Sequence, residues 1–347
     1  MTSAIQAGAA VAREDSFLST LRRRVTSIPL MFALALFLFA TAPLWIPIAI
    51  LVDLRRRPRT ALRCGVYLTF YAWWEVLALL ACAGVWLGTR VGREEDARER
   101  RLRWSYILQR RWAGALLAVA QRIFDFRVEV EGEDALEASP LLLFMRHASI
   151  ADSLLPSVLV SDPHGTRLRY VMKRELLWDP CLDVVGHWIP NYFARRDSDD
   201  SEHERRQVAA LAHDLGQGEG VMIYPEGTRF TEAKRSRVLE RLRSGGHEGL
   251  RARAERLHHV LPPRLGGPFA LLDAAPGVDV VFGAHTGFER AGSPGAIWNG
   301  SLVGAVIRAR FWRVPASEIP AGREARIDWL FEHWLRIDAF VGENASS

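Results

Sequence analysis

The chain has 347 residues, enough for one large domain or two ordinary ones, and 49% of them are hydrophobic. Its formal net charge is +5, but the arginines gather around apolar segments without interleaved aromatic residues. This pattern argues against a nucleic-acid-binding protein and indicates contact with anionic lipid headgroups. The three cysteines, Cys64, Cys82 and Cys181, have no paired spacing, so neither a disulfide framework nor a zinc site is expected.

Two apolar segments follow a basic arm of residues 1–27 and lie within residues 28–88. Residues 28–52 are uncharged and residues 65–88 are interrupted only by Glu75, so each segment is long enough to cross a bilayer. Apolar character continues past a signal-peptide-like ATA sequence, which favours a retained membrane anchor. For Glu75 we expect a helix–helix contact or an interfacial position, and a functional intramembrane carboxylate is the alternative.

Arginines flank the two apolar segments on every side. Arg22–Arg24 precede the first segment, five arginines separate the two, and Arg90, Arg93 and Arg98 follow the second. Two full spans with these flanks cannot satisfy the positive-inside rule. Because Pro43 and Pro47 allow the first segment to bend, a re-entrant or in-plane hairpin stays open beside two spans.

The rest of the chain alternates between helical and strand-like patterns. Residues 89–125 predict amphipathic helices, which either lie on the membrane surface or form a plain linker. Within residues 126–347 the patterns FRVEVEG, LLLFMR, RLRYVMK, IPNYFAR, GVMIYP, HHVLP, VDVVFGA and AVIRARFWRV predict strands. DSLLPSVLV, SEHERRQVAALAHDLGQG and TEAKRSRVLERLRS predict helices, and SGGHEG predicts a flexible turn. The alternation indicates an α/β domain in which loops at strand ends carry the site.

Two histidines are followed five residues later by an aspartate. His333 and Asp338 lie in an amphipathic helical pattern, where positions five apart are about 140° apart around the axis, so we expect an exposed pair that points apart. His147 ends an apolar strand, and the turn before the next helix can fold Asp152 back toward the imidazole. Ser149 and Asp152 also fit a capping box, which explains both polar residues without catalysis.

A second polar group stands in GVMIYPEGTRF, residues 220–230. Gly227 allows a backbone turn that a side chain would obstruct. Glu226, Thr228 and Arg229 then project from a strand-end loop, where an arginine can bind a phosphate in forked geometry. A surface turn with an incidental ion pair is the simpler alternative.

HASIAD followed by YPEGTRF resembles the glycerolipid acyltransferase family, which includes 1-acylglycerol-3-phosphate acyltransferases. That family has four ordered blocks: His-x4-Asp, a glycine-to-arginine block, Pro-Glu-Gly-Thr-Arg, and a proline block. The second resembles GHWIPNYFARR and the fourth resembles HVLPPRLGG, in which Arg196 and Pro262 are matching residues. FTEAKR and LPPR resemble the lysophosphatidate and lysocardiolipin branch. The chain departs from the family at Arg146, where asparagine is usual, and at Arg195, where aspartate is frequent.

The resemblance implies an acyltransferase domain over residues 126–347, with a mixed sheet flanked by helices, preceded by a membrane-anchoring helical hairpin. It implies transfer of an acyl group from acyl-CoA or another acyl thioester to the free hydroxyl of a lysophospholipid. The expected acceptor is 1-acyl-glycerol-3-phosphate, which would give phosphatidic acid. His147 would be the general base, oriented by Asp152, and Ser149 is expected to cap the helix and not to attack the thioester.

The same resemblance assigns the binding residues. Arg196 and Arg229 would bind the acceptor phosphate, Glu226, Gly227 and Thr228 would hold the loop or the glycerol hydroxyls, and Pro262 would lie beside the acyl chain. No metal or resident cofactor is expected, since acyl-CoA is a co-substrate, and the partners are lipids and not nucleic acid. The expected location is the cytoplasmic face of a bacterial inner membrane. An acyltransferase for another headgroup and a catalytically silent lipid-binding or scaffold protein are the alternatives.

Overall fold

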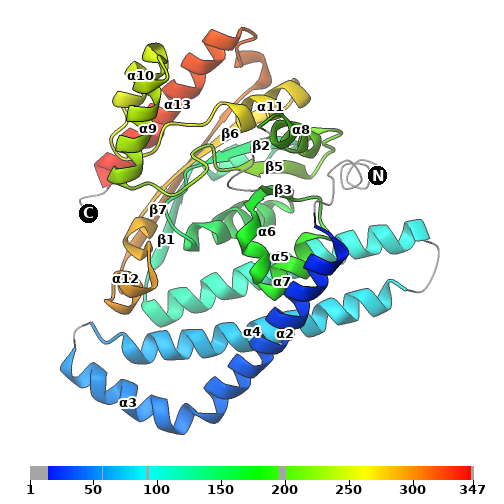
Figure 1. Cartoon of the computed structure of the whole chain (residues 1–347), viewed down its shortest axis with the longest axis vertical. Coiled ribbons are helices and arrows are strands. Elements are labelled where there is room, and N and C mark those ends of the chain that lie inside the picture. The colour runs from blue at the N-terminus through cyan, green and yellow to red at the C-terminus, as the bar shows by residue number, and fades with distance from the viewer. Residues whose placement is uncertain (1–14, 57, 91–93, 195–200, 345–347) are drawn as a thin grey trace.

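The strands of the chain form one seven-stranded sheet with helices on both faces, and a layer of long helices lies below it (Figure 1). The computed structural model describes residues 15–56, 58–90, 94–194 and 201–344. The strands are β1 (Arg127–Glu131), β2 (Leu141–Met145), β3 (Arg167–Lys173), β4 (Tyr192–Ala194), β5 (Glu219–Ile223), β6 (Asp279–Thr286) and β7 (Val306–Val314). Their order is β1-β7-β6-β2-β5-β3-β4, and β6 and β7 are antiparallel whereas the other neighbours are parallel. The predicted mixed α/β sheet is thereby confirmed.

The helices fall into a lower layer and a set that covers the sheet. The lower layer contains α2 (Phe17–Ala40), α3 (Ala42–Arg55), α4 (Ala61–Gly88) and α5 (Glu94–Phe124). The others are η1 (Glu133–Leu136), η2 (Ala151–Leu154), η3 (Pro156–Ser161), α6 (Asp162–His164), η4 (Arg174–Trp178), α7 (Pro180–Gly186), α8 (Ser201–Ala212), α9 (Glu232–Ser244), α10 (Glu248–Glu255), α11 (Gly266–Ala274), η5 (Phe288–Ala291), α12 (Pro294–Trp298), η6 (Ala316–Glu318) and α13 (Arg323–Asn344).

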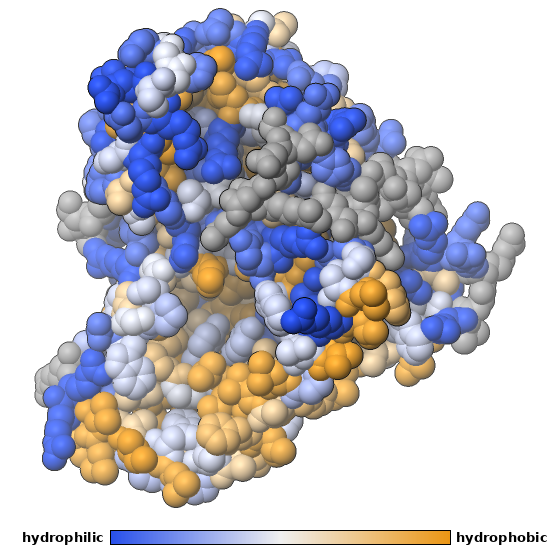
Figure 2. Space-filling model, in the orientation of Figure 1, coloured by the Kyte–Doolittle hydropathy of each residue, from blue (hydrophilic) through white to orange (hydrophobic). Residues whose placement is uncertain are grey.

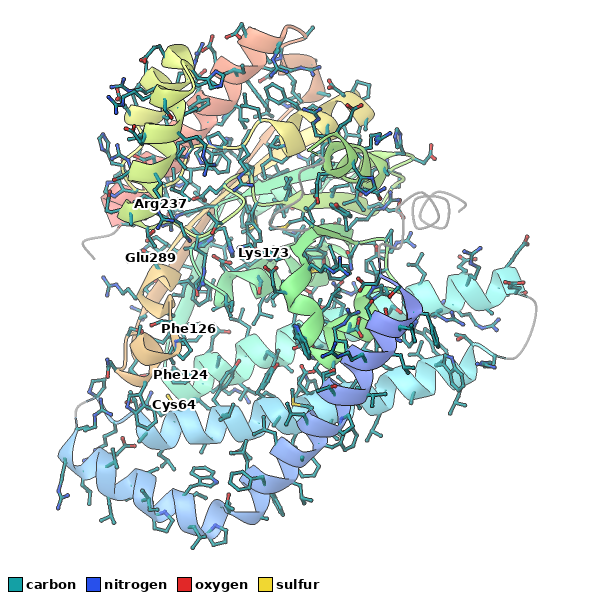
Figure 3. All side chains as sticks on the ribbon, viewed as in Figure 1. Cys64, Phe124, Phe126, Lys173, Arg237 and Glu289 are labelled. Atoms are coloured by element: carbon teal, nitrogen blue, oxygen red, sulfur yellow. The ribbon has the colours of Figure 1, made fainter. Side chains whose placement is uncertain are left out.

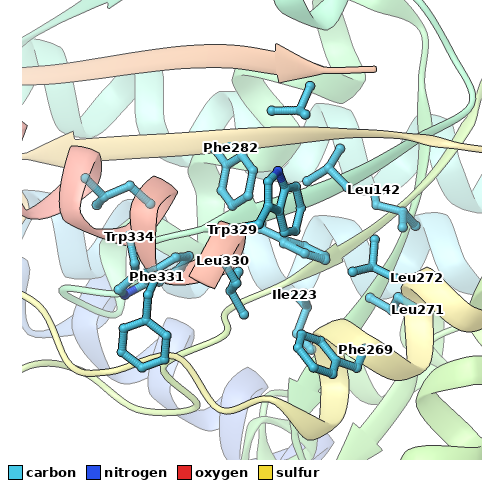
Figure 4. Packing of buried hydrophobic residues seen from close by; sticks show 14 of the residues in the cluster. Leu142, Ile223, Phe269, Leu271, Leu272, Phe282, Trp329, Leu330, Phe331 and Trp334 are labelled. Atoms are coloured by element: carbon cyan, nitrogen blue, oxygen red, sulfur yellow. The ribbon is translucent and has the colours of Figure 1, made fainter. Parts of the chain in front are cut away.

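The central strand β2 is apolar throughout because both of its faces are buried. Leu142 and Phe144 point into a cluster formed with α8, α11 and α13, which Figure 4 shows around Phe282 and Trp334. The alternate residues Leu141, Leu143 and Met145 point into a second cluster formed with α5 and η3. Two cores therefore hold the sheet from opposite sides.

The parallel strands bring several loops to one edge of the sheet. Leu143 pairs with Met222 of β5 and Met145 pairs with Gly283 of β6. Because β2, β3, β5 and β6 run in the same direction, the residues that follow each strand meet at this edge. The first and third sequence blocks are thus brought together, as the strand-end prediction required.

The first apolar segment is broken into two helices. α2 begins at Phe17, inside the predicted basic arm, and ends before Thr41, and Pro43 lies in the first turn of α3. The second apolar segment forms α4. By length and composition, α2 and α4 are long and apolar enough to cross a membrane.

The predicted strand HHVLP is wrong. Asp338 accepts the backbone N–H groups of residues 258, 259 and 260 at 2.6 to 3.1 Å, and Glu226 accepts that of Leu261 at 3.0 Å. Pro262 follows and has no N–H to donate. Because carboxylates satisfy these backbone groups, the segment needs no strand partner.

Two further predictions are corrected. The flexible turn predicted at SGGHEG is too long, because its last two residues, from Glu248 on, belong to α10. His333 and Asp338 do point apart, but neither is exposed as expected. His333 stacks on Phe282 with ring centroids 4.4 Å apart, whereas Asp338 is buried against the 258–260 backbone. The His333 ring is enclosed by Phe282 of β6 and by Trp312 of β7, whose Nε1–H donates to His333 Nδ1 at 3.1 Å.

Candidate active site

His147 and Asp152 meet in the loop after β2. The His147 Nδ1 atom lies 3.0 Å from Asp152 Oδ1, and the imidazole stacks on Tyr224 with ring centroids 4.4 Å apart. The His147 side chain is 12% exposed, whereas Asp152 is fully buried. Because Nδ1 faces a carboxylate, it carries the proton and leaves the Nε2 lone pair available to accept one.

The Asp152 carboxylate is held by several donors. Its second oxygen accepts the backbone N–H groups of Ala148 at 2.5 Å and Ser149 at 2.7 Å. Burial raises the pKa of Asp152, but the hydrogen bond from His147 and the nearby His285 outweigh burial and lower that pKa below its ordinary value. Asp152 is therefore an anion of fixed orientation, suited to hold an imidazole in one tautomer.

Ser149 builds the turn between the two residues. Its N–H donates to Asp152, which is one half of the capping box expected from the sequence. Its hydroxyl accepts from the Ala151 N–H at 3.1 Å and donates to the Ala291 carbonyl at 3.2 Å. Ser149 is fully buried, so its oxygen is engaged in the fold and is not aimed at a substrate.

Glu226 joins three of the sequence blocks. One carboxylate oxygen accepts the His147 backbone N–H at 2.9 Å, and the other accepts the Leu261 N–H at 3.0 Å. Burial raises the pKa of Glu226 to about 7, and the neighbouring Arg146 offsets only part of that effect. Of the two roles expected for Glu226, these contacts support holding the loops.

Gly227 makes the turn that the sequence predicts for it. Its φ is +66°, and an added Cβ would lie 2.9 Å from the Arg264 Nε atom. The Arg264 N–H donates to the Pro225 carbonyl at 2.9 Å, which fastens the proline block to this turn. Pro262 is buried beside it.

Thr228 and Arg229 are fixed from α9 and from the segment after η5. The Lys234 ammonium donates to Thr228 Oγ1 at 3.0 Å and to the Arg229 carbonyl at 2.8 Å. Arg229 donates to the Gly292 carbonyl at 2.9 Å and is half-buried. The phosphate-binding roles predicted for these residues stay predictions.

The second block is described only in part. The ring of Phe193 lies 2.7 Å from where a Cβ on Gly186 would stand, so this glycine lets α7 pack against β4. Arg196, the predicted phosphate ligand of this block, and Arg195 lie outside the described residues.

Two buried residues lie behind the pair: Arg146, which sequence reasoning noted as a departure without assigning it a role, and His285, which it missed. Arg146 is 2% exposed and donates to the His285 carbonyl at 2.6 Å. His285 Nε2 lies 2.9 Å from the Arg146 carbonyl oxygen and 3.5 Å from Asp152 Oδ2. The only signal in the sequence is a histidine at the end of the apolar strand VDVVFGAHT, and its register against β2 is not readable from one chain.

An apolar side of the site leads toward α4. Tyr224 and Cys64 both pack against the buried cluster that contains Phe124 and Phe126. In Figure 3 the labels of Phe126, Phe124 and Cys64 follow one another downward to α4. Within the described ranges, no group of three or more histidine, cysteine, aspartate or glutamate side chains is arranged to hold a metal ion.

With this geometry established, residues 127–266 match the family model described as Acyltransferase. This match covers an acyltransferase-type domain and supports the similarity to glycerolipid acyltransferases expected from the four blocks. Proteins named 1-acyl-sn-glycerol-3-phosphate acyltransferase delta from Homo sapiens and Pongo abelii are each 27% identical to it over 180 residues. These residues make up 50% of this chain and 45% of each relative, so the chain spans about half the length of the curated relatives it matches.

One solved structure is also similar to the acyltransferase chain. It is the crystal structure of the 1-acyl-sn-glycerophosphate (LPA) acyltransferase, PlsC, from Thermotoga maritima, with 14% identity and a TM-score of 0.48. The similarity covers 81% of this chain and 98% of that one. In the acyltransferase domain described above, the first, third and fourth blocks share one network through Glu226.

Proposed function

We propose that the protein is an O-acyltransferase that moves an acyl group from a thioester to the hydroxyl of a lysophospholipid. The observation that carries this proposal is the partly exposed His147 imidazole bound through Nδ1 to the fully buried Asp152 at 3.0 Å. A histidine held in this way presents Nε2 as a general base, and a buried carboxylate stabilises the imidazolium that forms.

The reaction needs no acyl-enzyme. As the acceptor oxygen attacks the thioester carbonyl, its proton passes to His147 Nε2. The tetrahedral intermediate then expels the thiolate, which takes this proton from the imidazolium and leaves as a thiol. The C–O ester bond is formed and the C–S bond is broken. The buried Ser149 hydroxyl, engaged with Ala291 and Ala151, supports direct attack by the acceptor.

The proposed acceptor is 1-acyl-glycerol-3-phosphate, and the proposed donor is acyl-CoA. Arg229 supports a phosphate headgroup, since a guanidinium that donates to Gly292 has further N–H groups for a phosphate oxygen. The names of the curated relatives agree with this acceptor. Another lysophospholipid headgroup is the neighbouring alternative, which a panel of lysolipids would identify.

The test is thiol release by the purified full chain in detergent, with lysophosphatidate and acyl-CoA. His147→Ala should lower kcat at least about a hundredfold because it removes the general base. Ser149→Ala is the matched control from the same loop and should keep most of the activity. If the wild-type protein released no thiol with any lysolipid and any thioester donor, the silent lipid-binding alternative would replace this proposal.

We also propose that the α2–α3 hairpin enters a membrane from one side and returns to that side without crossing it. Arg23 and Arg24, in the first half of α2, bind Asp183 of the acyltransferase domain at 2.6 and 2.7 Å. After α3, Thr60 donates to the Trp298 carbonyl of the same domain at 2.5 Å. The beginning of α2 and the segment after α3 therefore both contact the domain, so the two ends of the hairpin lie on the same side of the proposed membrane.

The length of α3 supports a re-entrant hairpin. Its 14 residues span about 21 Å, less than the ~30 Å hydrocarbon core of a bilayer. Figure 2 shows hydrophobic residues gathered over the α2–α4 layer, and the large exposed ones include Phe37, Phe39, Leu44 and Ile48. Because Arg23, Arg24 and Arg55 lie at the two ends of the hairpin that meet the domain, the expected position is the cytoplasmic face of a bacterial inner membrane.

Glu75 of α4 has a structural role in this arrangement. It is fully buried, and the Trp112 Nε1–H of α5 donates to its carboxylate at 2.6 Å. Tyr71, one helical turn earlier, donates to Asp179 at 2.9 Å. These contacts fasten α4 to α5 and to the start of α7, which supports the helix-packing interpretation of Glu75 over an intramembrane functional site.

A further inference from the structure

Arg146 is a charged residue inside the domain, immediately before His147. Its guanidinium donates to the His285 carbonyl at 2.6 Å and lies 3.4 Å from the Glu289 carboxylate. Glu289 is itself fixed by the Thr286 hydroxyl at 2.5 Å and the Gly287 N–H at 2.9 Å. The arginine thus binds the end of β6 and the turn that follows it.

The contact between Arg146 and the His285 carbonyl places His285 next to the His147–Asp152 pair. Because Met145 pairs with Gly283 in parallel strands, His147 and His285 stand at equivalent positions just past this pairing. His285 is fully buried, and its Nε2 lies 2.9 Å from the Arg146 carbonyl oxygen and 3.5 Å from Asp152 Oδ2. Each histidine therefore faces a different oxygen of the same carboxylate.

The protonation of His285 follows from its neighbours. Both atoms that face Nε2 are oxygens, so Nε2 carries the hydrogen. Nδ1 is buried and has no hydrogen-bond partner among the described residues. Burial lowers the pKa of His285, an effect that the Asp152 charge only partly offsets, so the ring is neutral. Its Nε2–H donates to the Arg146 carbonyl, and the same neutral, polar edge lies 3.5 Å from Asp152 Oδ2.

From this geometry we propose that His285, clamped by Arg146, is a positioning residue that holds the Asp152 carboxylate toward His147. The inference rests on the proposed acyl transfer. A neutral, polar N–H edge 3.5 Å away favours this orientation of the carboxylate while leaving most of its negative charge available to the imidazolium. A cationic residue at the same place would compete with His147 for that charge. Arg146 fixes His285 twice, because its guanidinium donates to the His285 carbonyl and its own carbonyl accepts from His285 Nε2.

The charged and titratable groups around the pair are few in the described structure. Asp152 and Tyr224 face the His147 ring, and Glu226 holds its backbone N–H. His285 is the additional group that faces Asp152. A change at His285 should therefore reach His147 through Asp152.

The test compares His285→Phe with His285→Gln in the full chain. His285→Phe removes the N–H edge, so we expect about a tenfold or greater loss of kcat at an unchanged KM, as a misplaced base gives. The acid limb of the kcat/KM profile should move to higher pH, because a less neutralised Asp152 holds the imidazolium more tightly. His285→Gln restores an N–H donor and should recover most of both effects.

A matched control and a second measurement keep the test decisive. His333→Phe alters another enclosed histidine, stacked on Phe282 in the opposite core, and should leave the acid limb in place. The His147 imidazole titration, followed by NMR in wild type and variants, reports the same shift without turnover.

The inference is overturned if His285→Phe leaves kcat within twofold and the titration unmoved. It is equally overturned if both His285 variants lose the same activity with no shift. A wild-type protein without turnover would sink the proposed function alone, since the NMR titration still judges His285.

Discussion

At the scale of single residues, Glu226 shows how the fold uses a carboxylate that the sequence suggests for substrate. Both of its oxygens accept backbone N–H groups, from His147 and from Leu261, and the side chain is buried. The proposed base is therefore positioned by a backbone contact as well as by Asp152. The cost is a carboxylate inside the protein, with its pKa raised to about 7 by burial.

This raised pKa predicts a pH-dependent stability. The ordinary value is 4.5, so the folded state favours the neutral form of Glu226. Its contribution is fully present below pH 4.5 and is lost as pH rises through about 7, amounting to roughly 3 kcal/mol. Glu226→Gln cannot titrate, so its unfolding free energy should fall less than that of wild type between pH 4.5 and 7.5.

Urea unfolding followed by circular dichroism at several pH values measures this difference. Glu240→Gln, at an exposed carboxylate of α9, is the control and should keep the wild-type slope. Parallel stability curves for wild type and Glu226→Gln would show that the buried carboxylate does not titrate in this range.

At the scale of elements, the sequence predicted most strands and the meeting of the first and third blocks. Period-two and uniformly apolar patterns are local, so β1, β2 and β3 were predicted within one or two residues. The contacts that could not be predicted from the sequence join residues far apart along the chain. Glu226 meets Leu261 across 35 residues, and Arg146 meets His285 across 139. The false strand HHVLP has the same cause, since Asp338 satisfies its backbone from 78 or more residues away.

The start of α2 is another long-range effect. A run of arginines next to an apolar segment was predicted to be a basic arm, yet Arg23 and Arg24 lie in α2 and both bind the fully buried Asp183. Removing one partner of a buried ion pair leaves charges without compensation. The α2 helix is therefore held to the acyltransferase domain through α7.

Asp183→Asn should release the beginning of α2. The substitution keeps the shape of the side chain but removes its charge, and we expect about 3 kcal/mol of destabilisation. Trypsin should then cleave after Arg22, Arg23 or Arg24 faster than in wild type. Glu129→Gln removes a more exposed pair with Arg308 and should cost less than about 1 kcal/mol without changing the digestion. Equal digestion of Asp183→Asn and wild type would mean that α2 is held by its apolar face alone.

At the scale of the whole molecule, charge and apolar surface are separated. Figure 2 shows hydrophobic residues over the lower helices and hydrophilic ones over α9 and α10 at the other end. The α9–α10 segment, residues 232–256, has eight lysines and arginines against four glutamates, a net charge of +4 beside +5 for the whole chain. Outside this segment the formal net charge is +1, so the arginines around the lower helices are offset by acidic residues elsewhere in the chain.

The depth of the α2–α3 hairpin decides between re-entry from one side and a full crossing. From Arg24 to Thr41 the helix rises about 26 Å, less than the ~30 Å core, so Thr41 should lie within hydrocarbon. In a Cys64→Ser background, a membrane-impermeant maleimide should not label Thr41→Cys from either side of sealed vesicles, and detergent should expose it. Ala252→Cys, exposed on α10, is the matched control and should be labelled from the domain's side. Labelling of Thr41→Cys from the side opposite Ala252 would establish that α2 spans the membrane, and α3 would then have to return through the bilayer.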